Sequence, residues 1–180
     1  MATQTLMTAE EFDKLPEEEG RRYELLDGEL IEVPSATPSH NDVRDELLTI
    51  LRNWLKERRS GKALSDTEFA IGISSRFKPD IAVLLGGKWA QVDRRKVPVV
   101  IIPDIVVEII SPSENAYTLH RKIASYLNAG VIEVWEVYHE TQDMRIHTGG
   151  GVRPLRASDT LTSPLLPGWS QPLEPLFRSE

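Results

Sequence analysis

The chain contains no cysteine, which excludes disulfide bonds, zinc–thiolate sites and thiol catalysis. It also lacks an apolar run of the roughly 18 residues that a membrane span requires. The longest apolar stretch, residues 97–110, is interrupted by Pro98, Pro103 and Asp104. The N-terminus has neither the basic start nor the apolar core of a secretory signal. We therefore expect a protein without a membrane partner in a reducing, cytoplasmic location.

Basic residues are scarce as well: 21 Lys and Arg stand against 28 Asp and Glu, a net charge of −7. This balance argues weakly against broad binding to nucleic acid through a strongly basic surface. The first 50 residues hold 4 basic and 13 acidic residues, so a local basic groove in the rest of the chain stays open. No linker divides the 180 residues, and we expect a single domain over 1–180.

Capping residues and helical periodicity indicate three helices. Thr8 and Glu11 have the spacing of a capping box, which predicts a short N-terminal helix. A threonine–proline pair at Thr37 starts a long helix that ends near Gly61. A third helix is expected over 113–129.

Strand signals alternate with these helices. Asp27-Gly28 is a strong turn signal between strands over 21–26 and 29–33, and predicts an N-terminal β-hairpin. Further strands are predicted over 69–73, 78–85, 99–110, 131–138 and 144–148. The order predicts an α/β protein, in which a mixed β-sheet is flanked by helices and an irregular tail from Ser163 packs over the core.

One carboxylate, Glu108, interrupts the β-branched run 105–110. A charge in a strand buried on both faces costs several kcal/mol unless a cation or metal meets it. A second buried strand is entered through Asp80, and carboxylates at the ends of neighbouring strands suit Mg²⁺ or Mn²⁺. Alternatively, Asp80 caps a turn and Glu108 pairs with one basic side chain.

Two further residues could join this site. Lys122 borders the inward stripe of the third helix, so its ammonium either reaches the strand ends to orient water and stabilise a phosphate, or remains at the surface. His40 lies in the first turn of the long helix. It either contacts substrate or an acid of the site, or is a core histidine with its hydrogen bonds satisfied.

A basic loop follows the Asp80 strand. We expect Lys88, Arg94 and Arg95 to lie near the acids and to contact phosphates, with Trp89 stacking on a base or anchoring the loop.

Four segments occur in an order that is more specific than any of them alone: Tyr23–Leu30, Pro79–Val83, Val107–Ser113, and Lys122–Tyr126 followed by Gly130-Val131. Together they resemble the Uma-type putative restriction endonuclease family of the PD-(D/E)XK nuclease superfamily. The resemblance runs from about Thr8 to the Pro-Leu-Leu-Pro-Gly segment near the C-terminus.

The resemblance implies a restriction-endonuclease-like core with Mg²⁺ (or Mn²⁺) bound by Asp80 and Glu108, helped by the backbone carbonyl of Ile109. The usual lysine of the superfamily, two residues after the second acid, is absent because Ile110 stands there. The resemblance gives its role to Lys122.

The resemblance also implies that Glu24 is an auxiliary acid of the site. The alternative from its position is an exposed strand residue beside Arg22.

Two positions depart from the family pattern, because Thr118 and Tyr138 stand where an aspartate is common. We therefore hold two expectations. One is a Mg²⁺-dependent endonuclease that hydrolyses phosphodiester bonds in DNA, as a homodimer by analogy with enzymes that cut both strands. The other is a degenerate copy that serves as a binding or interaction module.

Overall fold

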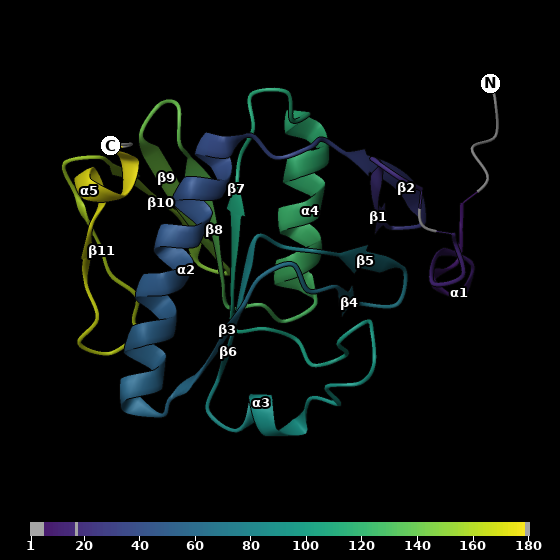
Figure 1. Ribbon diagram of the computed structural model, residues 1–180, viewed down its shortest axis with the longest axis horizontal. Helices are drawn as coiled ribbons and strands as arrows, with labels where there is room; N and C mark the ends of the chain where they lie inside the picture. The colour runs from purple at the N-terminus through teal and green to yellow at the C-terminus, as the bar shows by residue number, and fades with distance from the viewer. Residues whose placement is uncertain (1–5, 17, 179–180) are drawn as a thin grey trace.

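A six-stranded mixed sheet forms the centre of the computed structural model, which describes residues 6–16 and 18–178 (Figure 1). Its order is β10-β9-β8-β7-β6-β3, and only β7 and β8 are parallel neighbours. The strands are β3 (Gly61–Leu64), β6 (Ile81–Leu85), β7 (Ile105–Ile109), β8 (Glu133–Tyr138), β9 (Asp143–Thr148) and β10 (Gly151–Arg156).

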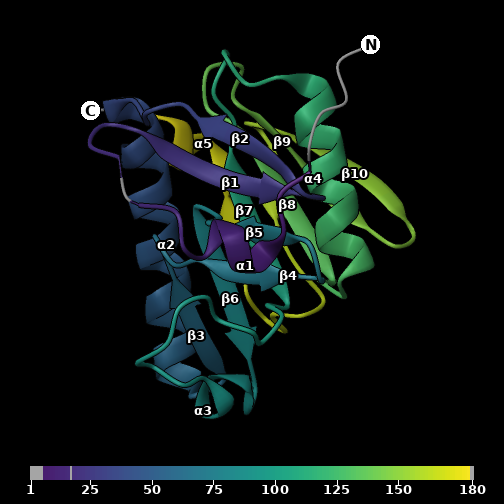
Figure 2. The ribbon, with the colours of Figure 1, turned by 90° about the vertical axis from the view of Figure 1, so that its right-hand side faces the viewer.

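A smaller sheet of order β2-β1-β5-β4 crosses in front of β6 and β7 in Figure 2. It comprises β1 (Arg22–Leu26), β2 (Glu29–Val33), β4 (Phe69–Ile71) and β5 (Ser75–Phe77). The hairpin of β1 and β2 confirms the prediction from Asp27-Gly28. Both turn residues have positive φ, 51° and 85°, as the tight hairpin turn requires.

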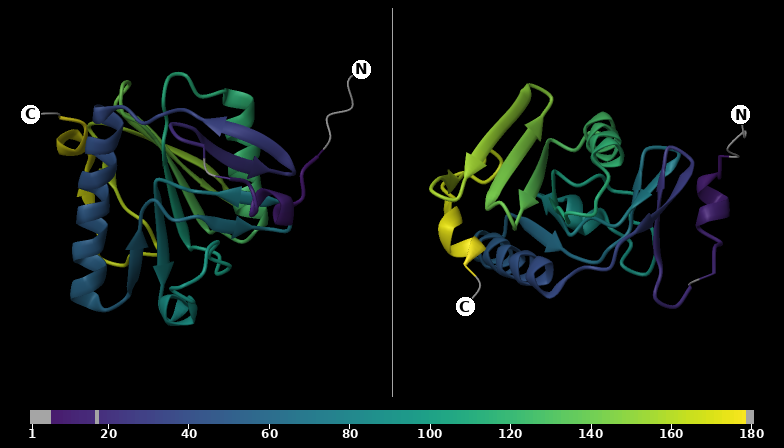
Figure 3. Two further views of the ribbon diagram at one scale, coloured as in Figure 1. Left: turned by 45° about the vertical axis from the view of Figure 1, so that its right-hand side comes forward. Right: turned by 90° about the horizontal axis from the view of Figure 1, so that it is seen from above.

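Two long helices cover opposite faces of the central sheet (Figure 3). On one face, α2 (Pro38–Arg58) buries Leu47, Leu51 and Leu55 against the inward residues of β6 to β9. On the other face, α4 (Ala116–Asn128) and the small sheet bury Ile123 and Tyr126 in a second apolar cluster. The predicted mixed sheet flanked by helices is therefore confirmed.

The N-terminal ends of two helices follow their capping residues. Thr8 and Glu11 form the capping box of α1 (Ala9–Phe12). Thr37 caps α2 by accepting a hydrogen bond from the backbone N–H of His40. The cap therefore fixes the first turn of α2, which carries His40 toward the sheet.

Some elements differ from their predictions. The strand expected over 99–110 is reduced to β7, because Pro103 offers no N–H to a ladder and Asp104 bonds to the backbone of β6 instead. Three strands, β3, β5 and β10, and the short α3 (Lys88–Gln91) were not predicted from the sequence. The tail contains β11 (Thr160–Leu161), β12 (Gln171–Pro172) and α5 (Leu173–Phe177), which joins the α2-side core. None of the helices in residues 6–16 and 18–178 combines the length and the apolar composition of a membrane span.

Candidate active site

The antiparallel pairing of β6 and β7 brings the two predicted metal ligands to the same end of the sheet. Ile81 pairs with Val107, so Asp80 and Glu108 each lie one residue beyond that pair. The backbone N–H of Ile109 donates to Asp80 Oδ2 at 2.7 Å, which ties the acid that precedes β6 to the neighbouring strand. The acids therefore come from adjacent strands, as expected.

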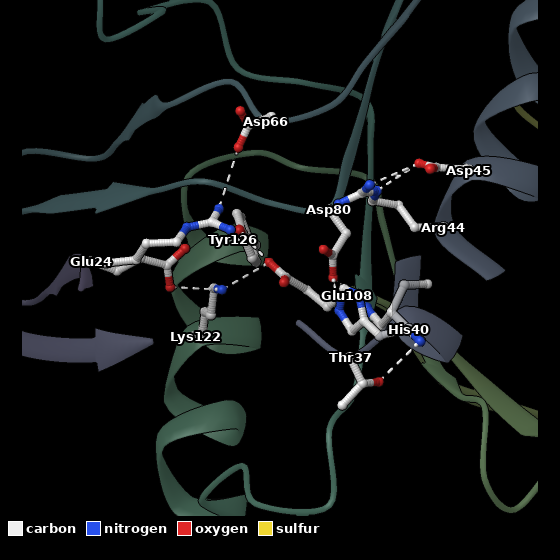
Figure 4. Close-up of polar contacts among 12 residues, drawn as sticks. Glu24, Thr37, His40, Arg44, Asp45, Asp66, Asp80, Glu108, Lys122 and Tyr126 are labelled. Carbon is white, nitrogen blue, oxygen red and sulfur yellow. Dashed lines mark hydrogen bonds and ion pairs between the residues drawn. The ribbon is translucent and has the colours of Figure 1, made fainter. Parts of the chain in front are cut away.

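Lys122 lies between two carboxylates (Figure 4). Its Nζ is 2.8 Å from Glu24 Oε2 and 3.1 Å from Glu108 Oε1. The relative exposures of Glu24, Glu108 and Lys122 are only 6%, 6% and 7%. The alternatives of an exposed glutamate and a surface lysine are therefore both wrong.

Tyr126 also holds Glu108 in place. It lies one helical turn after Lys122 on α4, and its hydroxyl donates to Glu108 Oε1 at 2.6 Å. One oxygen of Glu108 thus accepts the hydrogen bond of the phenol and forms an ion pair with the ammonium. Because both donors come from one face of α4, the packing of this helix orients the carboxylate.

Electrostatics in this cluster favour one more cation. The pKa of Glu108 is raised to about 8, chiefly by burial. The carboxylates of Glu24 and Asp80 also raise this pKa, and the ammonium of Lys122 offsets only part of the increase. Burial alone would lower the pKa of Lys122, but Glu108 and Glu24 outweigh it and raise that pKa, so the ammonium stays charged. Glu24 and Glu108 share a single buried ammonium while Asp80 lies near Glu108, and a divalent ion would relieve the repulsion among the three carboxyl groups.

His40 contacts one of the acids, which was one of the roles expected for it. Its Nε2 lies 3.3 Å from Asp80 Oδ2. Burial lowers the pKa of His40, but the hydrogen bond to Asp80 and the charge of that carboxylate have the larger combined effect and raise it. Asp80 Oδ2 therefore has two donors, the imidazole of α2 and the backbone of β7.

A cavity of about 210 Å³ opens over these groups, and Asp80, Glu108, Ile109 and Lys122 all line it. The contacts described above use Asp80 Oδ2 and Glu108 Oε1. The second oxygen of each carboxylate makes no hydrogen bond to any described residue. One oxygen on each strand is therefore left for a ligand in the cavity.

These donors fit a hard divalent cation. Among residues 6–16 and 18–178, no three His, Cys, Asp or Glu side chains gather as a metal-binding group. This argues against a cage made only of side chains. Mg²⁺ usually binds one or two carboxylates and keeps several waters, so one oxygen each from Asp80 and Glu108 would be enough side-chain ligands. The carbonyl of Ile109 stays a predicted third protein ligand.

The basic loop is not where the sequence analysis expected it. Because β6 runs away from Asp80, α3 and the loop after it lie at the opposite end of the sheet (Figure 1). Lys88 bonds to Asp104 Oδ1 at 2.7 Å, and the guanidinium of Arg94 lies 4.8 Å from the ring centre of Trp89. Neither these residues nor Arg95 line the cavity of the acids, so the expected proximity is wrong.

Four charged residues of the cavity were not assigned to the site from the sequence: Arg22, Glu32, Lys78 and Glu114. Arg22 shares a strand face with Glu24, so the period-two pattern of β1 could have revealed it. Lys78 and Glu114 had no such signal. Lys78 reaches the site through its backbone N–H, which donates to Glu24 Oε1 at 2.8 Å. Burial raises the pKa of Glu114.

Comparison with known proteins finds relatives of similar size. Two uncharacterized proteins of Synechocystis sp., slr1290 and sll1609, are 22% and 25% identical to this chain. The first alignment covers 76% of both chains, and the second covers 70% of this chain and 71% of its relative.

A crystal structure of a putative nuclease belonging to DUF820, from Anabaena variabilis, has the same fold. Its TM-score is 0.81 at 22% identity, over 95% of this chain and 97% of that chain. The family model Uma2, described as "Putative restriction endonuclease", matches residues 9–174. The chain therefore belongs to the Uma2 family of putative restriction endonucleases.

Proposed function

We propose that this protein is a Mg²⁺- or Mn²⁺-dependent endonuclease that hydrolyses phosphodiester bonds in DNA. The observation that carries the proposal is the buried group of Glu24, Glu108 and Lys122, which lines one cavity together with the partly exposed Asp80. Burying ionisable groups is costly, so a fold that retains three of them at one point beside a further acid indicates a function there. The description of the family and of the Anabaena protein supports nuclease chemistry.

Asp80 and Glu108 would hold the cation through the oxygens that have no partner among the described residues, with the carbonyl of Ile109 beside them. A bound divalent ion would supply a Lewis acid that polarises the phosphodiester and makes water a stronger nucleophile. His40 and the backbone of Ile109 keep Asp80 in position, and Tyr126 does the same for Glu108.

Lys122 acts as a fixed positive charge. Because its pKa is raised, it stays protonated and serves as a hydrogen-bond donor rather than as a general base. From the wall of the cavity the ammonium would donate to a phosphate oxygen or orient the attacking water. Glu24 holds it there at 2.8 Å, which makes Glu24 an auxiliary acid rather than a metal ligand.

Cleavage of plasmid and linear duplex DNA in Mg²⁺ or Mn²⁺ tests this proposal. Asp80→Asn should lower the cleavage rate roughly a thousandfold or more, since the ion supplies several kcal/mol of transition-state stabilisation. The control is Asp93→Asn, an acid of the loop at the far end of the sheet, which should cleave at the wild-type rate. Equal cleavage by wild type and Asp80→Asn would refute the assignment.

A second candidate function is binding without catalysis. It is favoured by the ammonium of Lys122, which already neutralises part of Glu108, and by Ile110 in place of the usual lysine. A wild-type protein that binds DNA but leaves it intact with both metals would support this candidate.

A further inference from the structure

Two basic side chains converge beside the acids without touching them. Arg22 Nη2 and Lys78 Nζ lie 3.3 Å and 2.8 Å from the same oxygen, Asp66 Oδ1. Both residues line the cavity that contains Asp80 and Glu108. They are thus cations at the edge of the proposed active site, and an aspartate at present holds them together.

The position of this pair is fixed by the same residue that holds Lys122. Arg22 lies two residues before Glu24 on β1, so both side chains point to one face of the strand, about 7 Å apart along it. Glu24 Oε1 accepts the backbone N–H of Lys78 at 2.8 Å. The two cations therefore have a defined place relative to the acids.

Asp66 is a weakly held partner. Its side chain is 67% exposed and lies in the turn between β3 and β4, where its φ is 51°. The hydrogen bond from Lys78 lowers the pKa of Asp66, so the carboxylate is ionised at neutral pH. Exposed ion pairs of this kind contribute little to stability and are easily exchanged.

We propose that Arg22 and Lys78 form a phosphate clamp that binds a DNA phosphate neighbouring the one over Asp80 and Glu108, and that Asp66 occupies the clamp until DNA displaces it. This inference rests on the proposed function. A phosphodiester presents two free oxygens, so each cation gains its own acceptor in place of one shared carboxylate oxygen.

The surroundings set a limit to the clamp. Arg22 and Lys78 also border a second cavity of about 580 Å³, whose lining includes three further acids, Asp13, Glu18 and Glu68, and one further cation, Arg21. These acids would repel a polyanion that continued in that direction. The clamp therefore ends the phosphate path on this side of the active site.

The clamp is tested by the salt dependence of DNA binding. A fluorescein-labelled DNA duplex is titrated with Asp80→Asn protein in EDTA, so that cleavage does not interfere, and anisotropy gives Kd over a series of salt concentrations. Adding Arg22→Gln or Lys78→Gln should weaken binding about tenfold at low salt and reduce the slope of log K against log[salt] by about 1. Adding Asp66→Asn should instead tighten binding, because it frees both cations.

The matched control is Arg95→Gln, an exposed arginine at the far end of the sheet, which should leave affinity and slope unchanged. Thermal unfolding checks that the clamp variants fold; Lys78→Gln keeps the backbone contact to Glu24.

Unchanged slopes in both clamp variants, weaker binding by Asp66→Asn, or no DNA binding by the parent would overturn the clamp. If the clamp variants change the salt slope but the wild type cleaves no DNA, the clamp is retained and the nuclease proposal is rejected. If the wild type cleaves DNA but the clamp variants leave the salt slope unchanged, the nuclease proposal is retained and the clamp is rejected.

Discussion

At the scale of single residues, the site depends on Lys122. Its ammonium has two buried carboxylates within 3.1 Å and lies on a helix whose other inward residues are apolar. The desolvation of these charges is offset by their mutual attraction and by the hydrogen bond from Tyr126. Without the lysine, two carboxylates would remain in the cavity wall with no buried cation between them.

Lys122→Met should therefore destabilise the protein by about 3–5 kcal/mol at about pH 8.5, where Glu108 of the wild-type protein is largely ionised. The loss should shrink toward about pH 6, because Glu108 of the wild type is then protonated and no longer gains from the charge of Lys122. Urea unfolding at the two pH values measures both effects. The neighbouring Arg121→Met is the control: Arg121 pairs with Glu29 and Asp27 but is 24% exposed, so its loss should cost at most about 1 kcal/mol. Equal losses for both variants would contradict this account.

At the scale of elements, the site is assembled from the ends of strands and from helices, each with a well-defined boundary. The chain before β6 and the end of β7 supply the two acids, α4 supplies Lys122 and Tyr126, and the first turn of α2 supplies His40. The cap at Thr37 sets where α2 begins, and so sets the distance of 3.3 Å between His40 and Asp80.

Thr37→Ala should lower the free energy of unfolding by about 1 kcal/mol through loss of the cap. It should also slow DNA cleavage severalfold, because the first turn that positions His40 frays. Chemical unfolding and the cleavage assay measure the two effects. Thr8→Ala removes the equivalent cap from α1, which does not contribute to the cavity of the acids, and should leave the cleavage rate unchanged. A Thr37→Ala protein with the wild-type cleavage rate would show that the cap has no part in the site.

The sequence predicted what local chemistry determines. The capping box at Thr8, the turn at Asp27-Gly28 and the strand around Glu108 were foreseen because each is encoded within a few residues. The basic loop was misplaced because its position depends on the direction of β6 relative to Asp80, which the local pattern does not contain. Lys78 was missed for the same reason, since only a tertiary hydrogen bond brings it to Glu24.

At the scale of the whole molecule, the chain has a net negative charge, and acidic residues outnumber basic ones in the lining of the cavity as well. A net charge of −7 opposes the approach of DNA, so the proposed binding would depend on local cations and on a divalent ion. The two sheets, α4, the first turn of α2 and the loops beside them line that cavity, and the match to the Uma2 family spans residues 9–174, so it includes all of these segments. The central claim is that Asp80 and Glu108 together bind this ion.

Calorimetric titration with Mn²⁺ tests that claim most directly. The wild type should bind one ion, and the Asp80→Asn and Glu108→Gln variants should bind none. The control replaces Glu136, a buried glutamate of β8 that pairs with His147. The Glu136→Gln variant should bind Mn²⁺ like the wild type. The ion competes with a proton on Glu108, whose pKa is about 8, so affinity should rise roughly eightfold from about pH 7 to about pH 8.5. Equal Mn²⁺ affinity in wild type and Asp80→Asn, or no binding by wild type at millimolar Mn²⁺, would contradict the account.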